Sequence, residues 1–106
     1  MSEVTLSRKE AGSQFEVPAG AVVVLRLPEN PSTGYQWEVD AGSDVDVISN
    51  AYLQNTSSGS GGGGVRELRL LPKRPGVHRV VGALRRAWAP DSPVDSCEFG
   101  LRVHGT

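Results

Sequence analysis

The side chains that most often carry chemistry are few and scattered in this sequence. It has a single cysteine, Cys97, and two histidines, His78 and His104. A catalytic or metal site needs such groups in partnership, with a nucleophile beside a base or several ligands at fixed spacing. Neither histidine has a partner at metal-ligand spacing, and Cys97 falls in phase with apolar neighbours, which predicts a buried thiol. We therefore expect no catalytic residues, no metal and no cofactor.

The glycine-rich run Gly59–Gly64 does not match a nucleotide-binding loop. A phosphate-binding loop ends in Gly-Lys-Ser or Gly-Lys-Thr, and a dinucleotide-binding loop opens a helix. Here Val65-Arg66-Glu67 follows, in a segment with the alternation of a strand. An enzyme is not expected. Short polar residues and glycines predict a loop that cannot order itself by burying apolar surface.

A second distinctive segment is the hexapeptide Asn30, Pro31, Ser32, Thr33, Gly34 and Tyr35. Pro31 fixes its own φ and pushes Asn30 toward an extended conformation. Gly34 can take a positive φ, and the short polar side chains can bond to the nearby backbone. The pattern predicts a compact, self-braced turn.

Length and charge limit what the chain can be. Its 106 residues suit one domain, 1–106, and a net charge of −1 gives no reason to expect nucleic acid or a membrane surface as partner. No apolar run is long enough for a membrane helix. The segment Met1–Glu10 has no apolar core of a signal peptide. The sequence leaves the compartment open: the chain as written is expected in the cytoplasm, and a trimmed chain would be secreted or periplasmic.

The elements that position these segments are strands. Apolar residues alternate along several short runs, and no run has helical periodicity. Counting Val4–Leu6 and Phe15–Val17 as one element, we expect an all-β, immunoglobulin-like antiparallel sandwich of about seven strands without a disulfide. A small β-barrel is the competing architecture. The arginines between Val65 and Arg86 are expected on a solvated face.

Strand parity predicts which loops lie together. In such a sandwich alternate connections fall at opposite ends, so the loops around 27–35, 55–64 and 85–93 should share one end. The last of these holds Trp88 outside the core alternation, next to Arg86 and Ala87. Trp and Arg are enriched at interface hot spots. Loops on a rigid scaffold often carry binding residues, which favours a binding module.

These segments together resemble the chagasin family of cysteine-protease inhibitors. That family has an Asn-Pro-(Thr/Ser)-Thr-Gly-(Tyr/Phe) loop, a Gly-x-Gly-Gly loop and an Arg-Pro-Trp loop, in this order, on an immunoglobulin-like sandwich. Here Ala87 replaces the proline of the third motif, and the glycine run is longer than the pattern.

The resemblance implies a monomeric, reversible inhibitor of papain-like cysteine proteases. It implies that Thr33 comes nearest the catalytic cysteine, that the glycine loop lines the cleft through its main chain, and that Trp88 with Arg86 packs against the primed side. The implied contact residues are Asn30, Pro31, Ser32, Thr33, Gly34, Tyr35, Gly61, Gly62, Gly63, Gly64, Arg86, Ala87 and Trp88. The alternative is a non-inhibitory binding module that uses the same loop end for another protein. The sequence does not identify the target protease.

Overall fold

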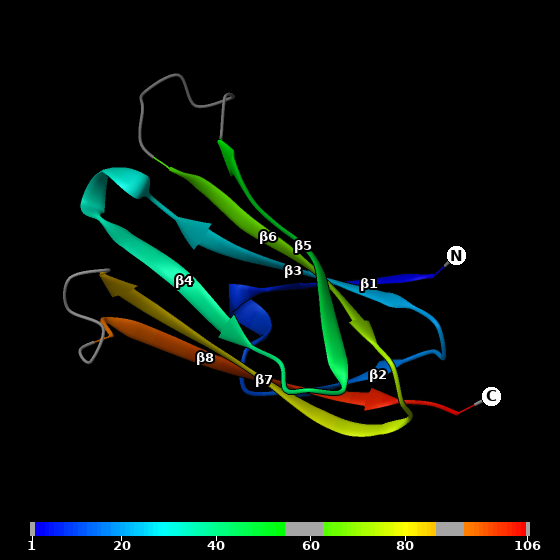
Figure 1. The fold of residues 1–106 in the computed structure, drawn as a ribbon. Coiled ribbons are helices and arrows are strands. Elements are labelled where there is room, and N and C mark those ends of the chain that lie inside the picture. Colours follow the sequence, from blue (N-terminus) through cyan, green and yellow to red (C-terminus); the bar gives the residue numbers. More distant parts are fainter. Residues whose placement is uncertain (1, 55–62, 87–92, 106) are drawn as a thin grey trace.

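The computed structural model describes residues 2–54, 63–86 and 93–105, which form eight strands and two short 3-10 helices (Figure 1). In chain order the elements are β1 (Glu3–Ser7), η1 (Arg8–Glu10), β2 (Gln14–Val17), β3 (Val22–Glu29), η2 (Pro31–Thr33), β4 (Tyr35–Asp40), β5 (Val45–Gln54), β6 (Gly64–Pro72), β7 (Gly76–Arg86) and β8 (Asp95–Val103). Among these elements there is no helix long and apolar enough to cross a membrane.

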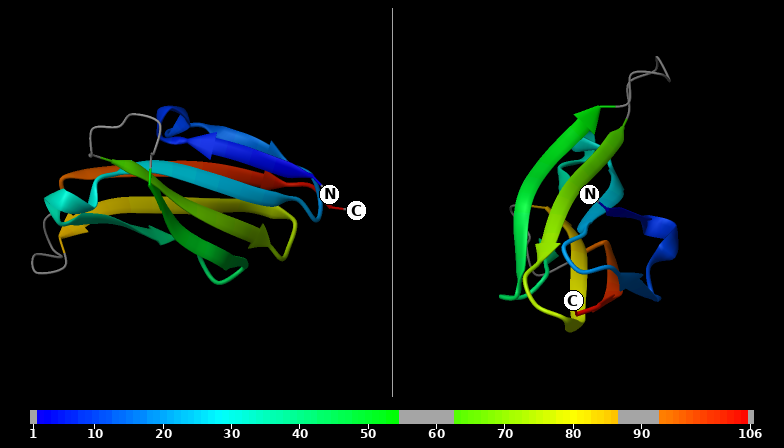
Figure 2. Two further views of the ribbon diagram at one scale, coloured as in Figure 1. Left: turned by 90° about the horizontal axis from the view of Figure 1, so that it is seen from above. Right: turned by 90° about the vertical axis from the view of Figure 1, so that its right-hand side faces the viewer.

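The strands form two four-stranded sheets, ordered β1-β3-β6-β5 and β2-β8-β7-β4. Figure 2 shows the two sheets as stacked layers. Pairing is antiparallel except at one edge of each sheet, where β1 pairs with β3 and β2 pairs with β8 in parallel. The all-β sandwich expected from the sequence is confirmed. Cys97 is free and buried, so it forms no disulfide.

The expected strand count is corrected at the N-terminus. The two pieces taken as one element are separate strands, β1 and β2, and they belong to different sheets. Between them η1 and a turn at Gly12, with φ of 93°, redirect the chain. A positive φ at a residue without Cβ costs little, which permits the sharp crossing. The count is therefore eight strands, because the chain changes sheet within this segment.

The core lies between the inward faces of the sheets and follows the predicted alternation. Val23, Leu25 and Leu27 of β3 are each at most 1% exposed. The same phase buries further side chains of β4, β6 and β8: Trp37, Leu68, Leu70, Cys97, Phe99, Leu101 and Val103. Burying a large apolar side chain of this kind stabilises the fold by about 1.5–3 kcal/mol. The sheets are thereby fixed as a rigid support for their connections.

The strand register brings together the ends of the loops around 27–35, 55–64 and 85–93, as strand parity predicts. Gly64, the first residue of β6, pairs with Glu29 at the end of β3 and with Gln54 at the end of β5. In the other sheet, Tyr35 at the start of β4 pairs with Arg86 at the end of β7. The strand ends that flank residues 30–34, 55–63 and 87–94 therefore lie at one end of the sandwich.

Candidate functional site

The first loop is a single turn of 3-10 helix, η2, with Asn30 as the capping residue before it. Asn30 is extended, with φ of −124° and ψ of 105°, as expected before a proline, and Pro31 opens the helix η2. The Asn30 side-chain oxygen accepts hydrogen bonds from the Ser32 backbone N–H at 3.1 Å and from the Ser32 hydroxyl at 2.7 Å. This cap satisfies a backbone donor that the short helix cannot satisfy itself.

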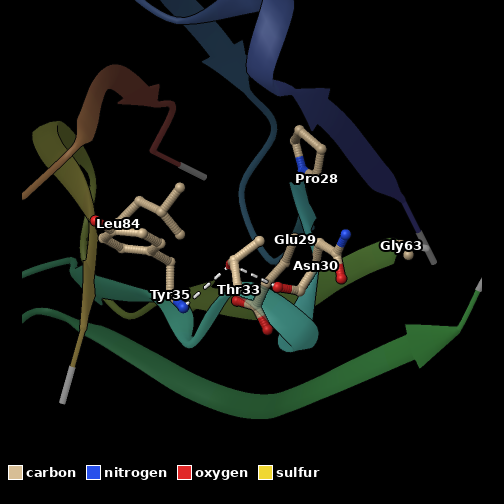
Figure 3. Close-up of a pocket in the computed structure, with 8 residues that line it drawn as sticks. Pro28, Glu29, Asn30, Thr33, Tyr35, Gly63 and Leu84 are labelled. Carbon is tan, nitrogen blue, oxygen red and sulfur yellow. Dashed lines mark hydrogen bonds between the residues drawn. The ribbon is translucent and has the colours of Figure 1, made fainter.

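Thr33 and Gly34 close the same loop. The Thr33 hydroxyl donates to the Asn30 carbonyl oxygen at 2.8 Å and accepts from the Tyr35 N–H at 3.2 Å (Figure 3). Gly34 has a φ of 82°, and its N–H donates to the Pro31 carbonyl oxygen at 3.1 Å. Side chains and backbone thus hold the turn from both sides, and the predicted self-braced turn is confirmed.

The glycine segment reaches the first loop at Gly63 and Gly64. A Cβ placed on Gly63 would lie 3.5 Å from the Glu29 carbonyl oxygen and 3.8 Å from the Asn30 Cβ. A Cβ on Gly64 would fall on the Leu53 carbonyl oxygen and within 2.7 Å of the Tyr52 hydroxyl. Gly64 is therefore required by the fold itself. Gly61 and Gly62 lie outside the described residues.

The third segment meets the first through Arg86. The Arg86 guanidinium lies over the Tyr35 ring, 4.4 Å from its centroid. Such an arrangement is attractive because the ring face is electronegative. Ala87 and Trp88 lie outside the described residues, so their predicted contact role stays a prediction.

An open groove of about 510 Å³ runs between the first loop and the start of β6 (Figure 3). It is lined by Pro28, Glu29, Asn30, Thr33, Tyr35, Gly63, Gly64 and Leu84. Of the predicted contact residues, Asn30, Thr33, Tyr35, Gly63 and Gly64 thus share one surface. The structure thus brings together residues 28–35 and 63–64, which are separated in the sequence by the rest of β4 and by β5.

Two residues at this end were missed by the sequence interpretation. The side chains of Glu29 and Arg66 are only 2% and 13% exposed and form a salt bridge at 2.8 Å. Arg66 therefore departs from the solvated face expected for the arginines of this region. The alternation did indicate on which face these side chains lie, because Glu29 is in phase with Leu27 on β3, and Arg66 is in phase with Leu68 on β6. It gave no indication that the two residues pair.

The remaining reactive side chains form no second site in the described part of the chain. Burial raises the pKa of the Cys97 thiol, which lowers the fraction of reactive thiolate. His78 lies 2.8 Å from the Arg74 carbonyl oxygen and His104 2.5 Å from a Glu16 carboxylate oxygen. No group of three potential metal ligands occurs among the residues described. The predicted structural role of Cys97 agrees with its burial.

The fold and the loop end define a class of protein: an immunoglobulin-like β-sandwich that presents a braced turn and a glycine segment at one end. Within this class, the family model described as Chagasin family peptidase inhibitor I42 matches residues 16–103. The chain belongs to this family, and the resemblance seen in the sequence is confirmed. The family consists of inhibitors and not of enzymes.

Curated relatives and solved structures agree with this assignment. Chagasin from Trypanosoma cruzi is 27% identical over 93 residues, which cover 82% of this chain and 84% of that protein. Amoebiasin-2 from Entamoeba histolytica is 27% identical over 86 residues, covering 78% of this chain and 70% of that protein.

Two solved structures show the same fold. The crystal structure of a cysteine protease inhibitor from Entamoeba histolytica matches with a TM-score of 0.89 and 23% identity, over 98% of this chain and 97% of that chain. PbICP-C, solved in complex with falcipain-2, matches with a TM-score of 0.61 and 12% identity, over 98% of this chain and 100% of that chain.

Proposed function

We propose that this protein is a reversible inhibitor of papain-like cysteine proteases that blocks the active-site cleft with residues 30–35, 59–64 and 86–88. The observation that carries the proposal is the braced turn Asn30–Tyr35, standing beside Gly63 at the loop end of the sandwich. Family membership supports it. The names of the matched structures, a cysteine protease inhibitor and PbICP-C in complex with falcipain-2, support the same target class.

The first loop acts as a wedge that occupies the cleft without being cleaved. Cleavage requires a peptide carbonyl to reach an attack geometry at the catalytic cysteine. The carbonyl oxygens of Asn30 and Pro31 already accept hydrogen bonds from Thr33 and Gly34 within the loop. Extending the loop to offer either carbonyl would break these bonds and the Asn30 cap. Thr33, at the end of η2, is the residue that we place nearest the catalytic cysteine.

The glycine segment lines the cleft beside the wedge. Without side chains, the backbone at Gly61–Gly64 can approach another backbone closely and offer its N–H and C=O groups. The position of Gly63 next to Asn30 puts the end of this segment within reach of whatever surface the first loop contacts.

We place the third contact on the flank of the wedge where Arg86 lies. Arg86 stacks on Tyr35, so the chain that leads to Trp88 leaves the sandwich beside the first loop. A tryptophan offers a large apolar surface that binding removes from water, with few rotatable bonds to freeze. Trp88 is therefore proposed as the main anchor. A three-segment contact of this kind buries about 1,600 Å² in total.

Occupation of the cleft can be tested with two forms of papain. Calorimetry should detect binding to papain whose catalytic thiol carries only a small methylthio group. It should detect no binding when a bulky peptidyl inhibitor, covalently attached to the same thiol, fills the cleft. Equal binding to both forms would place the contact outside the cleft and contradict the proposal.

A further inference from the structure

Glu29 is the one buried polar or charged residue in the described part of the chain, with 6% of its surface exposed. It ends β3 and directly precedes Asn30. Its carboxylate accepts hydrogen bonds from Arg66, Nε to Oε1 at 3.0 Å and Nη2 to Oε2 at 2.8 Å. The Trp37 backbone N–H donates to the same Oε1 at 2.8 Å. Both oxygens of the buried carboxylate thus accept hydrogen bonds, as burial of a charge demands.

These bonds join the two stems of the first loop. Pro28 and Glu29 lead into the loop from the first sheet, whereas Trp37 follows it in the second sheet. Besides its backbone bond to Glu29, Trp37 donates through its indole Nε1 to the Pro28 carbonyl oxygen at 2.7 Å. The separation and orientation of the stems therefore depend on a carboxylate at one stem and an indole at the other.

The same ion pair reaches the base of the glycine segment. Arg66 lies two residues after Gly64 on β6. Its Nη1 donates to the Asn50 side-chain oxygen on β5 at 2.9 Å. The Arg66 guanidinium thus connects β5 and β6, the strands that flank the glycine segment, with Glu29 at the stem of the first loop.

A buried ion pair contributes little to the net free energy of folding, because the cost of removing two charges from water offsets much of their attraction. It does impose a defined geometry, since the carboxylate and the guanidinium meet in only a few orientations. We infer that Glu29 and Arg66 are positioning residues that set the first loop relative to the glycine segment. They contribute to protease affinity through this geometry and not by touching the protease. The inference rests on the proposed inhibitory function.

The test compares Glu29→Gln with Glu67→Gln in the full chain. Glu67 pairs with Arg26 at 3.1 Å across the same strands, β3 and β6, but the Arg26 side chain is 48% exposed. Both variants replace a glutamate by glutamine. Only the Glu29–Arg66 pair lies at the stems of the first loop. We expect Glu29→Gln to raise the dissociation constant for papain about fivefold or more, mainly through faster dissociation. Glu67→Gln should stay within about twofold. Unchanged affinity in Glu29→Gln would overturn the inference.

A core variant and hydrogen exchange distinguish a specific effect on the first loop from a general loss of stability. Val80→Ala removes volume from the core at a residue that is 1% exposed in the middle of β7. It should lower the unfolding temperature but leave papain affinity intact. The Thr33 and Gly34 amides, which donate within the first loop, should exchange faster in Glu29→Gln than in Val80→Ala. Equal exchange in the two variants would overturn the inference.

The same experiment also covers a Glu29→Gln variant that does not fold and a parent protein that does not inhibit papain. If Glu29→Gln does not fold, Arg66→Lys replaces it, because lysine keeps the charge but loses the two-pronged contact, and the same changes are expected. If the parent protein leaves papain fully active, the proposed function fails. The exchange of the loop amides then still decides whether the ion pair positions the loop.

Discussion

The guanidinium of Arg86 and the ring of Tyr35 face each other with 4.4 Å between the guanidinium carbon and the ring centroid. The two residues are also partners in the strand register, at the end of β7 and the start of β4. Tyr35 closes the first loop and Arg86 opens the third. The stacking therefore joins two of the proposed contact segments before any protease is bound.

Removing this stacking should weaken inhibition. A cation over an aromatic face contributes about 0.5–1 kcal/mol at an exposed site and more where water is excluded. We expect Arg86→Ala to raise the inhibition constant for papain about three- to tenfold. Tyr35→Phe keeps the ring and serves as the control, with a change within about twofold. A loss from Tyr35→Phe as large as that from Arg86→Ala would assign the effect to the hydroxyl and contradict the stacking.

Trp88 is predicted to be the main anchor of the third segment. Trp88→Ala should raise the dissociation constant at least about tenfold, which corresponds to about 1.4 kcal/mol. Val94→Ala is a matched control, since Val94 belongs to the same connection between β7 and β8 and is 55% exposed. Surface plasmon resonance with immobilised papain measures both variants. Similar affinities for the two variants would remove Trp88 from the anchor role.

The conformation of Gly34 should matter for inhibition and not only for folding. Gly34 and Gly42 have nearly the same φ, 82° and 83°, but Gly42 connects β4 to β5, away from the first loop. Replacing either by alanine places a Cβ in the left-handed region and costs about 1–2 kcal/mol of stability. We expect similar losses in urea unfolding, but weaker papain inhibition only for Gly34→Ala. Equal inhibition by the two variants would show that the shape of the turn is not part of the contact.

An ion pair at the base of the third segment should make the free energy of unfolding depend on pH. Arg8 Nη2 lies 2.8 Å from Asp95 Oδ1 at the start of β8. The hydrogen bond from Arg8 lowers the pKa of Asp95 from its ordinary value of 3.8. Because the folded pKa lies below the unfolded one, the contribution is fully present above the unfolded pKa and is lost as pH falls through the folded pKa.

Both side chains are more than a third exposed, so solvent screening limits the pair to about 0.5 kcal/mol. Asp95→Asn should therefore lower the free energy of unfolding by this amount at about pH 7 and have almost no effect at about pH 2. Urea titrations at both pH values test this. Asp46→Asn, at the looser Lys73–Asp46 pair of 3.4 Å, is the control. An effect of Asp95→Asn that persists in acid would contradict the ion pair as its cause.

Much of the fold follows from local patterns. The alternation along β8 predicts that Phe99 and Leu101 face the core, and both are buried. The turn at Asn30–Gly34 is also local, because a proline, a glycine and short polar side chains each favour the conformation found there. Strand parity then places the strand ends that flank the three loops correctly, because successive connections between antiparallel strands fall at alternate ends of the sandwich.

The parts that could not be predicted depend on long-range contacts. The transfer of the chain from β1 to β2 places neighbouring segments in different sheets, which no local alternation specifies. Glu29 and Arg66 are each charged, and charged residues are seldom buried unless they are paired. Their pairing across 37 positions of sequence becomes visible only when β3 and β6 are aligned.

The central claim is that the loop end of this sandwich blocks the cleft of a papain-like protease. Titrating the purified protein into papain with a fluorogenic substrate tests it most directly. We expect stoichiometric loss of activity with a dissociation constant below about 1 µM, recovery of activity on dilution, and an inhibitor chain of unchanged mass. Full papain activity in the presence of a large excess of the protein, or an inhibitor cleaved within residues 30–35, would contradict the claim.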